Sequence, residues 1–320
     1  MAPAGGEAVT VYPRGSFGFQ PVVGRTIHYW PPGNYEELFM GLPVAGQHFW
    51  GSFLADGQRV VPIRQTQNDL AVRFLLFEGT EGEDLKLTGA AGFSGIADVD
   101  TRDSRWGLFQ PGRKERFALA TNEESLLWRE DGEFEVFGRP LGDAFQFTIP
   151  DAEEPLGYRV RYWTVEGTRD GHDLRGVVGH EQVYVRPGSG WFTSRYMADL
   201  EQVWLGFVTE FDDGVTVHGQ ICRGRQGFKF AMIQSSDGDA VTTGSVECRP
   251  SFDDNGFPLL IDFQLGDGSE WVYRSPGGDR MAIPGDDAPK WREGIVTKKH
   301  DTRNVVFSHC WCEVFPQRFP

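Results

Sequence analysis

Short runs of alternating apolar and polar residues, separated by Asp-Gly or Asn-Gly pairs, run through the whole sequence. Alternation with a period of two is typical of half-buried β-strands, and these pairs readily adopt the left-handed dihedrals of tight hairpin turns. The pattern predicts an all-β chain with few short helices, the best helix signal being Asn34 to Met40. The pairs are Asp56-Gly57, Asp131-Gly132, Asp213-Gly214, Asp237-Gly238, Asn255-Gly256 and Asp267-Gly268.

A weak internal repeat relates the two halves of the chain. Phe49-Trp50-Gly51, followed by the pair at Asp56, corresponds to Val203-Trp204-Leu205, followed by the pair at Asp213. Chance recurrence in a β-rich chain and a true duplication explain this equally well. A polar stretch after Pro150 marks a candidate boundary. We therefore expect two similar domains, residues 1–155 and 156–320, each a β-barrel or a strongly curved β-sandwich.

The charge balance disfavours several partners. The sequence has 46 acidic and 31 basic residues, a net charge of −15, which repels nucleic acid and anionic membranes. No stretch approaches the roughly 18 apolar residues that span a bilayer, and the N-terminus lacks the pattern of a signal peptide. We expect a cytoplasmic monomer or homodimer with free thiols. The 25 Phe, 10 Trp and 8 Tyr residues indicate interiors lined by aromatic rings.

Three hydrogen-bonding side chains share one face of a predicted strand at residues 178–185. Alternation places His180, Gln182 and Tyr184 on one side, with Glu181 and Val183 on the other. If the polar side faces a cavity, His180 can move protons and Tyr184 can donate to a ligand oxygen. The alternative is a strand whose polar face lies in water.

The hairpin at residues 206–224 has a second polar face, which carries Thr216, His218 and Gln220. On the strand before its turn, alternation places Glu201 on the same side as Val203. A buried carboxylate is costly unless it is paired or functional, so an inward Glu201 would have a raised pKa and could act as a general acid or base. If Glu201 lies instead at a solvent-exposed end of the strand, its charge needs no partner and no function.

Aromatic residues and one arginine complete the candidate ligand-binding set. Rings with a few oriented polar groups are typical of apolar pockets, although ordinary packing between elements explains them as well. Arg105 could hold an anionic group of a ligand or belong to an ion-paired surface turn. The remaining candidates are Tyr29, Trp30, His48, Trp50, Trp191 and Trp204.

A metal site is not expected. His309-Cys310-Trp311-Cys312 contains good zinc ligands, but no second closely spaced Cys or His pair completes a set of four. Free cysteines in a closing strand behave as small apolar residues, and we expect Cys310 and Cys312 to be buried. The sequence also lacks the glycine-rich phosphate and dinucleotide motifs, so no cofactor is expected.

Three segments resemble a known family: residues 132–140 (GEFEVFGRP), 178–185 (VGHEQVYV) and 206–224 (GFVTEFDDGVTVHGQICRG). Through them the chain resembles tandem lipocalin-like (calycin) proteins of bacteria and, more distantly, the carotenoid 1,2-hydratase, hydroxyneurosporene synthase and Diels-Alderase-like superfamily. The resemblance implies two lipocalin-like β-barrel domains packed together, with a hydrophobic cavity for a terpenoid, polyketide or similar molecule. Relatives use such cavities for water addition, isomerisation or ring closure without an organic cofactor.

These observations lead us to expect a cofactor-independent lyase or isomerase of hydratase, dehydratase or cyclase type. Its substrate would be a largely apolar terpenoid, steroid or aromatic molecule. His180 and His218 would move protons, and Trp191 and Trp204 would form the walls. Two alternatives stay open: a non-catalytic carrier of a hydrophobic small molecule, and a carbohydrate-active β-sandwich with aromatic platforms and a carboxylate pair.

Overall fold

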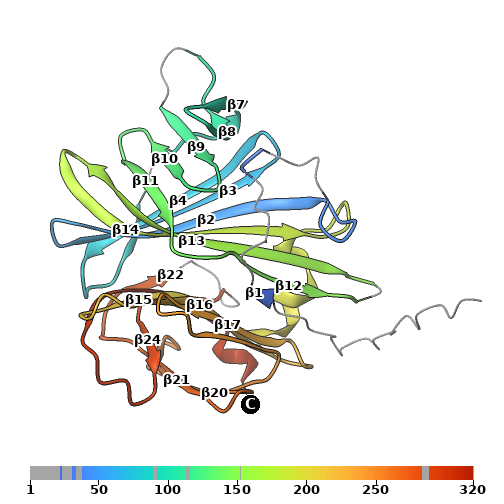
Figure 1. Cartoon of the computed structure of the whole chain (residues 1–320), viewed down its shortest axis with the longest axis vertical. Helices are drawn as coiled ribbons and strands as arrows, with labels where there is room; N and C mark the ends of the chain where they lie inside the picture. The colour runs from blue at the N-terminus through green and yellow to red at the C-terminus, as the bar shows by residue number, and fades with distance from the viewer. Residues whose placement is uncertain are drawn as a thin grey trace, which may run out of the picture.

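The computed structural model describes residues 22–23, 31–33, 38–88, 92–112, 116–151, 153–282 and 288–319. Over these residues the strands form three antiparallel sheets stacked in layers (Figure 1). The prediction of an all-β chain with strongly curved sheets and few short helices is confirmed. The helical segments within the described ranges are η1 (Trp191–Thr193), η2 (Tyr196–Leu200) and η3 (Pro316–Arg318), and none is long and apolar enough to cross a membrane.

The first sheet contains the strands of the N-terminal part of the chain, and the strands of the second and third sheets alternate along the rest. The first contains β1 (Val22–Val23), β2 (Val44–Ala55), β3 (Gln58–Gln67), β4 (Leu70–Thr80), β5 (Lys86–Thr88), β6 (Gly95–Ile96), β7 (Asp98–Arg102), β8 (Arg105–Phe109), β9 (Phe117–Thr121), β10 (Leu126–Glu130), β11 (Phe134–Pro140), β12 (Phe145–Ile149), β13 (Leu156–Arg169) and β14 (His172–Tyr184). The second contains β15 (Glu201–Phe211), β16 (Thr216–Gly224), β17 (Lys229–Ser235), β18 (Ala240–Thr243), β22 (Arg280–Ala282), β23 (Lys290–Arg292) and β25 (Val305–Val314). The third contains β19 (Val246–Phe252), β20 (Pro258–Leu265), β21 (Glu270–Arg274) and β24 (Ile295–Lys298).

All six Asx-Gly pairs are hairpin turns. They join β2 to β3, β10 to β11, β15 to β16, β17 to β18, β19 to β20 and β20 to β21. The glycine of every pair has a positive φ, from 73° at Gly57 to 104° at Gly238. Such values strain other residues, so the glycine in each pair permits the turn.

Apolar side chains pack between the layers and also fill the space that the curled first sheet encloses. This sheet curls over one of its own faces, because residues from strands far apart in its order, such as Leu76 on β4 and Leu119 on β9, share one cluster with Trp128. Its other face packs on the second sheet through a cluster rich in rings. A third cluster lies between the second and third sheets and contains Cys310 and Cys312, which are buried as expected.

The internal repeat corresponds to two similar arrangements of strands. The meander β2–β5 and the meander β15–β18 each begin with a strand that also pairs with the last long strand of its sheet, β14 or β25. The boundary expected near residue 155 lies between β12 and β13, which pair with each other inside the first sheet. The chain passes to the second sheet only between Tyr184 and Glu201.

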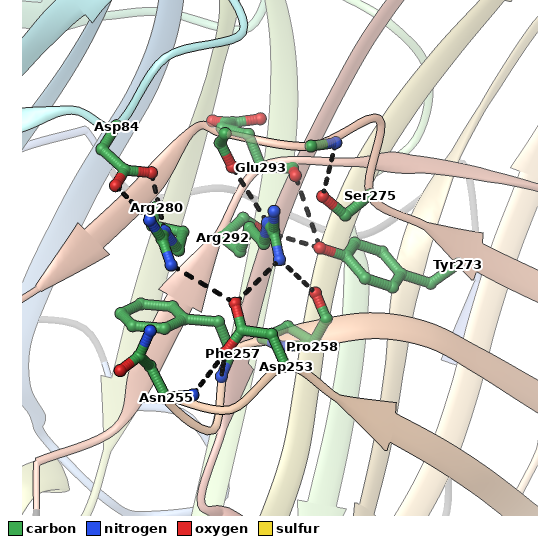
Figure 2. Close-up of polar contacts among 12 residues, drawn as sticks. Asp84, Asp253, Asn255, Phe257, Pro258, Tyr273, Ser275, Arg280, Arg292 and Glu293 are labelled. Carbon is green, nitrogen blue, oxygen red and sulfur yellow. Dashed lines mark hydrogen bonds and ion pairs between the residues drawn. The ribbon is translucent and has the colours of Figure 1, made fainter.

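One cluster of ion pairs connects all three layers (Figure 2). Arg280 on β22 donates to both oxygens of Asp84, which precedes β5, at 2.7 and 2.5 Å. Asp253, in the turn after β19, accepts from Arg280 at 3.5 Å and from Arg292 at 3.4 Å. Backbone bonds reinforce the connection, because Leu85 N donates to Arg280 O at 2.9 Å.

The helix expected at Asn34 to Met40 is wrong over its described part. Residues 34–37 lie outside the described residues, and Phe39 pairs with Leu42 through two backbone hydrogen bonds of 3.0 and 2.9 Å. The turn between them places Met40 at a φ of 55° and Gly41 at 75°. A bridge closed around left-handed residues cannot continue as a helix.

Candidate functional site

A cavity of about 90 Å³ lies between the first and second sheets. Its deeper walls are buried side chains from β2, β15, β23 and β25, and its mouth carries partly exposed residues such as Gln65, Arg73 and Met197. This volume is below the roughly 300 Å³ at which small-molecule pockets usually begin, so the cavity fits one end of a ligand. The lining residues are His48, Trp50, Ile63, Gln65, Arg73, Leu75, Glu181, Trp191, Met197, Glu201, Trp204, Trp291, Trp311 and Glu313.

Five of the fourteen lining residues are tryptophans. Trp291 and Trp311 have ring centroids 4.8 Å apart, and Trp50 lies 6.3 Å from Trp311. On the other side, Trp191 meets Trp204 edge to face at 5.3 Å. Indole rings give large apolar surfaces with electron-rich faces, so the wall suits unsaturated or aromatic molecules and developing positive charge.

Two glycines make room for Trp50. A Cβ atom added at Gly179, its neighbour on β14, would lie 2.3 Å from Trp50 Cζ2. A Cβ atom at Gly206, on β15 of the facing sheet, would lie 2.8 Å from Trp50 Cη2. Both positions therefore require glycine while the indole ring crosses the space between the two sheets.

Glu201 and Glu313 form a hydrogen-bonded carboxyl pair at the cavity wall. Burial raises the pKa of Glu201 well above its ordinary value, and the charge of Glu313 raises it further. Burial also raises the pKa of Glu313, although the indole N–H of Trp291 donates to its Oε2. Two adjacent carboxyls cannot both ionise cheaply, so the pair retains a proton near neutral pH.

Glu201 reaches the cavity through a β-bulge. The pairing of β15 with β16 shifts register between Glu201 and Val203. Val203 packs with Leu205 and Phe207 between the second and third sheets, whereas Glu201 lines the cavity together with Trp204. The sequence-based expectation that Glu201 shares a face with Val203 is therefore wrong, because the extra residue of a bulge breaks the alternation.

Glu181 is the third carboxyl of the cavity and lies on β14. Burial raises its pKa to about 7, while hydrogen bonds from Tyr158, Trp50 and Gln220 oppose that rise. Gln220 Nε2 lies 3.4 Å from Glu181 Oε1 and donates to Tyr158 Oη at 2.7 Å. His48 Nδ1 is 3.8 Å from Glu181 Oε2, and burial lowers the pKa of His48 to about 4, so this histidine is neutral at neutral pH.

The polar face of β14 is buried, but on the side away from the cavity. His180 stacks on Phe49 at 3.8 Å, and its Nε2 lies 2.5 Å from Gln47 Oε1. Gln182 donates to the same Gln47 oxygen at 3.1 Å, and Tyr184 donates to Gln182 at 3.3 Å. The shared face is confirmed, whereas the placement of His180, Gln182 and Tyr184 in the ligand cavity is not supported, because Glu181 occupies the face that lines it.

The other predicted residues are divided between the cavity and the rest of the protein. His218 does face the first sheet, with ring centroids 5.3 Å from Phe145 and 5.6 Å from Tyr162, but the described cavity lining does not include it. Arg105 donates to Ser125 Oγ at 2.9 Å and lines a separate open groove. Tyr29 and Trp30 lie outside the described residues. His48, Trp50, Trp191, Glu201 and Trp204 meet at the cavity.

Sequence reasoning missed nine of the fourteen residues that line the cavity, and four of these nine are aromatic or acidic. Trp291, Trp311 and Glu313 lie on β23 and β25, and Glu181 lies on β14. Alternation was the available signal for β25, because it places Glu313 with Trp311 and His309, away from Cys310 and Cys312.

Comparisons with known proteins give structural likeness only. No family model matches the sequence, and no curated protein matches it. Kievitone hydratase from Nectria haematococca has a TM-score of 0.45 and 9% identity, covering 85% of this chain and 89% of that one. A Nitrosomonas europaea protein provisionally assigned as AttH has a TM-score of 0.43 and 13% identity, covering 92% of this chain and 98% of that one. Likeness at this level assigns no activity.

Proposed function

We propose that this chain is a cofactor-independent lyase of hydratase or dehydratase type, acting on a largely apolar terpenoid, steroid or aromatic molecule. One observation carries the proposal: a hydrogen-bonded carboxyl pair at the wall of a tryptophan-lined cavity. Burying carboxyl groups against apolar surface is costly, and a mere carrier of apolar ligands gains nothing from them. Strongly raised carboxyl pKa values in a cavity are typical of catalytic acids and bases.

Adding water across a C=C bond needs both an acid and a base, and the pair supplies both. Glu201 gives its proton to one carbon of the double bond, and a water molecule attacks the neighbouring carbon. Glu313 takes the proton that the water loses. The proton then passes from Glu313 to Glu201 along the hydrogen bond between the two carboxyls. The same steps in reverse order remove water. The indole faces stabilise positive charge that develops on carbon.

The small volume and the polar mouth limit the substrate. One unsaturated end of the molecule enters between Trp50, Trp204 and Trp311, while its remainder lies toward Gln65 and Arg73. Glu201 and Glu313 are in direct contact, so this pair does not have the wider spacing of about 5 Å or more that glycosidase carboxylates need. The pair therefore favours the lyase over the carbohydrate-active alternative.

The test is turnover of a panel of neutral terpenoid alkenes and alcohols in D₂O. Mass spectrometry follows the gain or loss of one water and the incorporation of deuterium. We expect Glu201→Gln and Glu313→Gln each to lower turnover by about 10²–10⁴-fold, because each removes one partner in proton transfer. Glu210→Gln, an exposed position on the same strand as Glu201, is the matched control and should retain activity. Undiminished turnover in both cavity variants would refute the assignment, and a ligand bound but returned unchanged by the wild type would indicate a carrier.

A further inference from the structure

A second hollow, of about 520 Å³, lies beside η3 and is strongly basic. Arg223 and Arg225 lie at the end of β16 and just beyond it, Lys229 begins β17, and Arg318 ends η3. Within the described part of the chain, these four cations line the hollow and no carboxylate side chain does. Its full lining is Gln202, Arg223, Arg225, Gln226, Gly227, Lys229, Gln317, Arg318 and Phe319.

Nearby groups offset only part of this positive charge. Arg223 and Lys229 share one carboxylate, Glu247, at 3.6 and 2.6 Å, and the Glu247 side chain is 63% exposed. Arg225 and Arg318 instead donate to backbone carbonyls near the end of η2, Arg225 Nε to Asp199 O at 3.0 Å and Arg318 Nη2 to Ala198 O at 2.7 Å. A carbonyl dipole does not cancel a full charge, and the carboxyl groups of Glu201, Asp199 and Glu313, which also act on Arg318, do not line the hollow. In a chain of net charge −15, the hollow is a local reversal of sign.

The chemistry of the hollow fits an oxyanion that carries more than one charge. Guanidinium groups present planar sets of N–H donors that match phosphate oxygens, and a lysine adds a mobile point charge. The volume lies within the range of small-molecule sites. We propose that this basic hollow binds a multiply charged phosphate-type anion, either free in solution or as the headgroup of an anionic lipid.

The hollow adjoins the carboxyl pair of the cavity. Glu201 lines the cavity, the next residue, Gln202, lines the hollow, and Arg318 Nη1 donates to Glu201 O at 2.7 Å. The charge of Arg318 opposes the rise in pKa of both Glu201 and Glu313. A bound anion would offset this charge, so the pair would keep its proton to a higher pH. The other titratable or charged groups around the pair are Glu181 on β14, Cys222 on β16, His48 on β2 and Arg73 on β4.

Calorimetric titration of the full chain with inorganic diphosphate tests the site, with sodium chloride at matched ionic strength as the reference. We expect binding that weakens as salt is added, and that is weakened about tenfold or more in the double variant Arg225→Gln, Lys229→Gln. The double variant Lys298→Gln, Arg303→Gln removes the same charge elsewhere and should bind as the wild type does. Absence of binding beyond the chloride reference, or equal weakening in both double variants, would overturn the proposal.

Sedimentation with lipid vesicles separates the two sources of phosphate. Binding to vesicles that contain phosphatidic acid, absent with pure phosphatidylcholine and lost in the Arg225, Lys229 variant, assigns a lipid headgroup. Diphosphate binding without sedimentation assigns a free anion. The pH dependence of tryptophan fluorescence then tests the coupling, because Trp291 donates to Glu313. We expect diphosphate to move the midpoint of this fluorescence titration to a higher pH in the wild type. An unchanged midpoint would overturn the link between the hollow and the carboxyl pair.

Discussion

Single side chains define the chemistry of the cavity, and Glu181 shows how burial sets their protonation. Its side chain is 13% exposed, and the pKa of about 7 divides its population between two charge states near neutral pH. A carboxyl in this state can take up or release a proton at little energetic cost. The neighbouring His48 does not compete in this pH range, because burial holds its pKa near 4.

The raised pKa of Glu181 predicts a specific dependence of stability on pH. Between about pH 4.5 and 7 the folded state binds more protons than the unfolded state, so the free energy of unfolding falls as pH rises. Titration of Glu181 should lower the free energy of unfolding by about 1–3 kcal/mol between pH 5 and pH 8, and Glu181→Gln should abolish this decrease. Urea unfolding of both proteins at the two pH values measures this.

A matched control makes that measurement specific. Asp279, whose pKa burial raises to about 6, titrates in the same window but is present in both proteins, so the difference between them reports on Glu181. Glu210→Gln, on an exposed position, should leave the pH dependence of the wild type unchanged. If the free energy of unfolding changed equally with pH in the wild type and in Glu181→Gln, the raised pKa of Glu181 would be refuted.

At the scale of elements, the cavity depends on how closely β2, β14 and β15 approach one another around Trp50. Gly206 lies opposite Trp311 on β25, and an added Cβ atom there would lie 2.8 Å from Trp50 Cη2, so glycine at this position leaves space for the Trp50 ring. Tyr162 Oη, which donates to Gly219 O at 2.9 Å, would also lie 3.0 Å from an added Cβ. Strand packing and cavity shape are therefore linked.

Gly206→Ala should destabilise the fold and reshape the cavity together. The added methyl group meets two buried rings, and overpacking of this kind costs about 1–3 kcal/mol. Urea unfolding measures the loss of stability, and the tryptophan emission spectrum reports the displacement of Trp50. Gly190→Ala is the control, because its Cβ would meet only Thr193 Oγ1 at 3.7 Å and its φ of −149° suits alanine. Equal stability of the two variants would contradict the tight packing.

At the scale of the whole molecule, buried and partly buried charges join the layers. Arg59 on β3 donates to Ser52 Oγ and Glu81 Oε1, both at 2.9 Å, and its Nε lies 3.6 Å from Asp279 Oδ1. Glu293, 3.9 Å from Arg59, also pairs with His309 Nδ1 at 2.8 Å. This cluster connects the first sheet to the second, beside the ion pairs of Figure 2.

Arg59→Met should destabilise the protein strongly. Asp279 would lose a cationic partner while it stays buried, and a buried pair broken on one side typically costs about 3–5 kcal/mol. The loss should be smaller at pH 5 than at pH 8, because protonated Asp279 needs no cation. Lys298→Met, which breaks an exposed pair with Asp239, should cost less than about 1 kcal/mol in the same urea titrations. Similar losses in the two variants would show that the cluster does not hold the sheets together.

The sequence by itself determined the local structure of this protein. Alternation gave the strands and their faces, and the Asx-Gly pairs gave the hairpins, because both depend on neighbours within a few residues. It also identified Trp50, Trp204, His48, Trp191 and Glu201, whose residue types suit a ligand cavity. Alternation predicted the wrong face of the strand for Glu201, because a bulge adds a residue to one strand there.

Only the tertiary structure decided which faces meet at the cavity. Alternation correctly placed His180 and Glu181 on opposite faces of β14, but both faces of this strand are largely buried. One is enclosed by the curl of the first sheet, and the other packs on the second sheet. Periodicity distinguishes the two faces but does not say which one borders a cavity, because that depends on long-range packing. For the same reason, periodicity could not show that Glu201 and Glu313, which are distant in the sequence, are in contact in the fold.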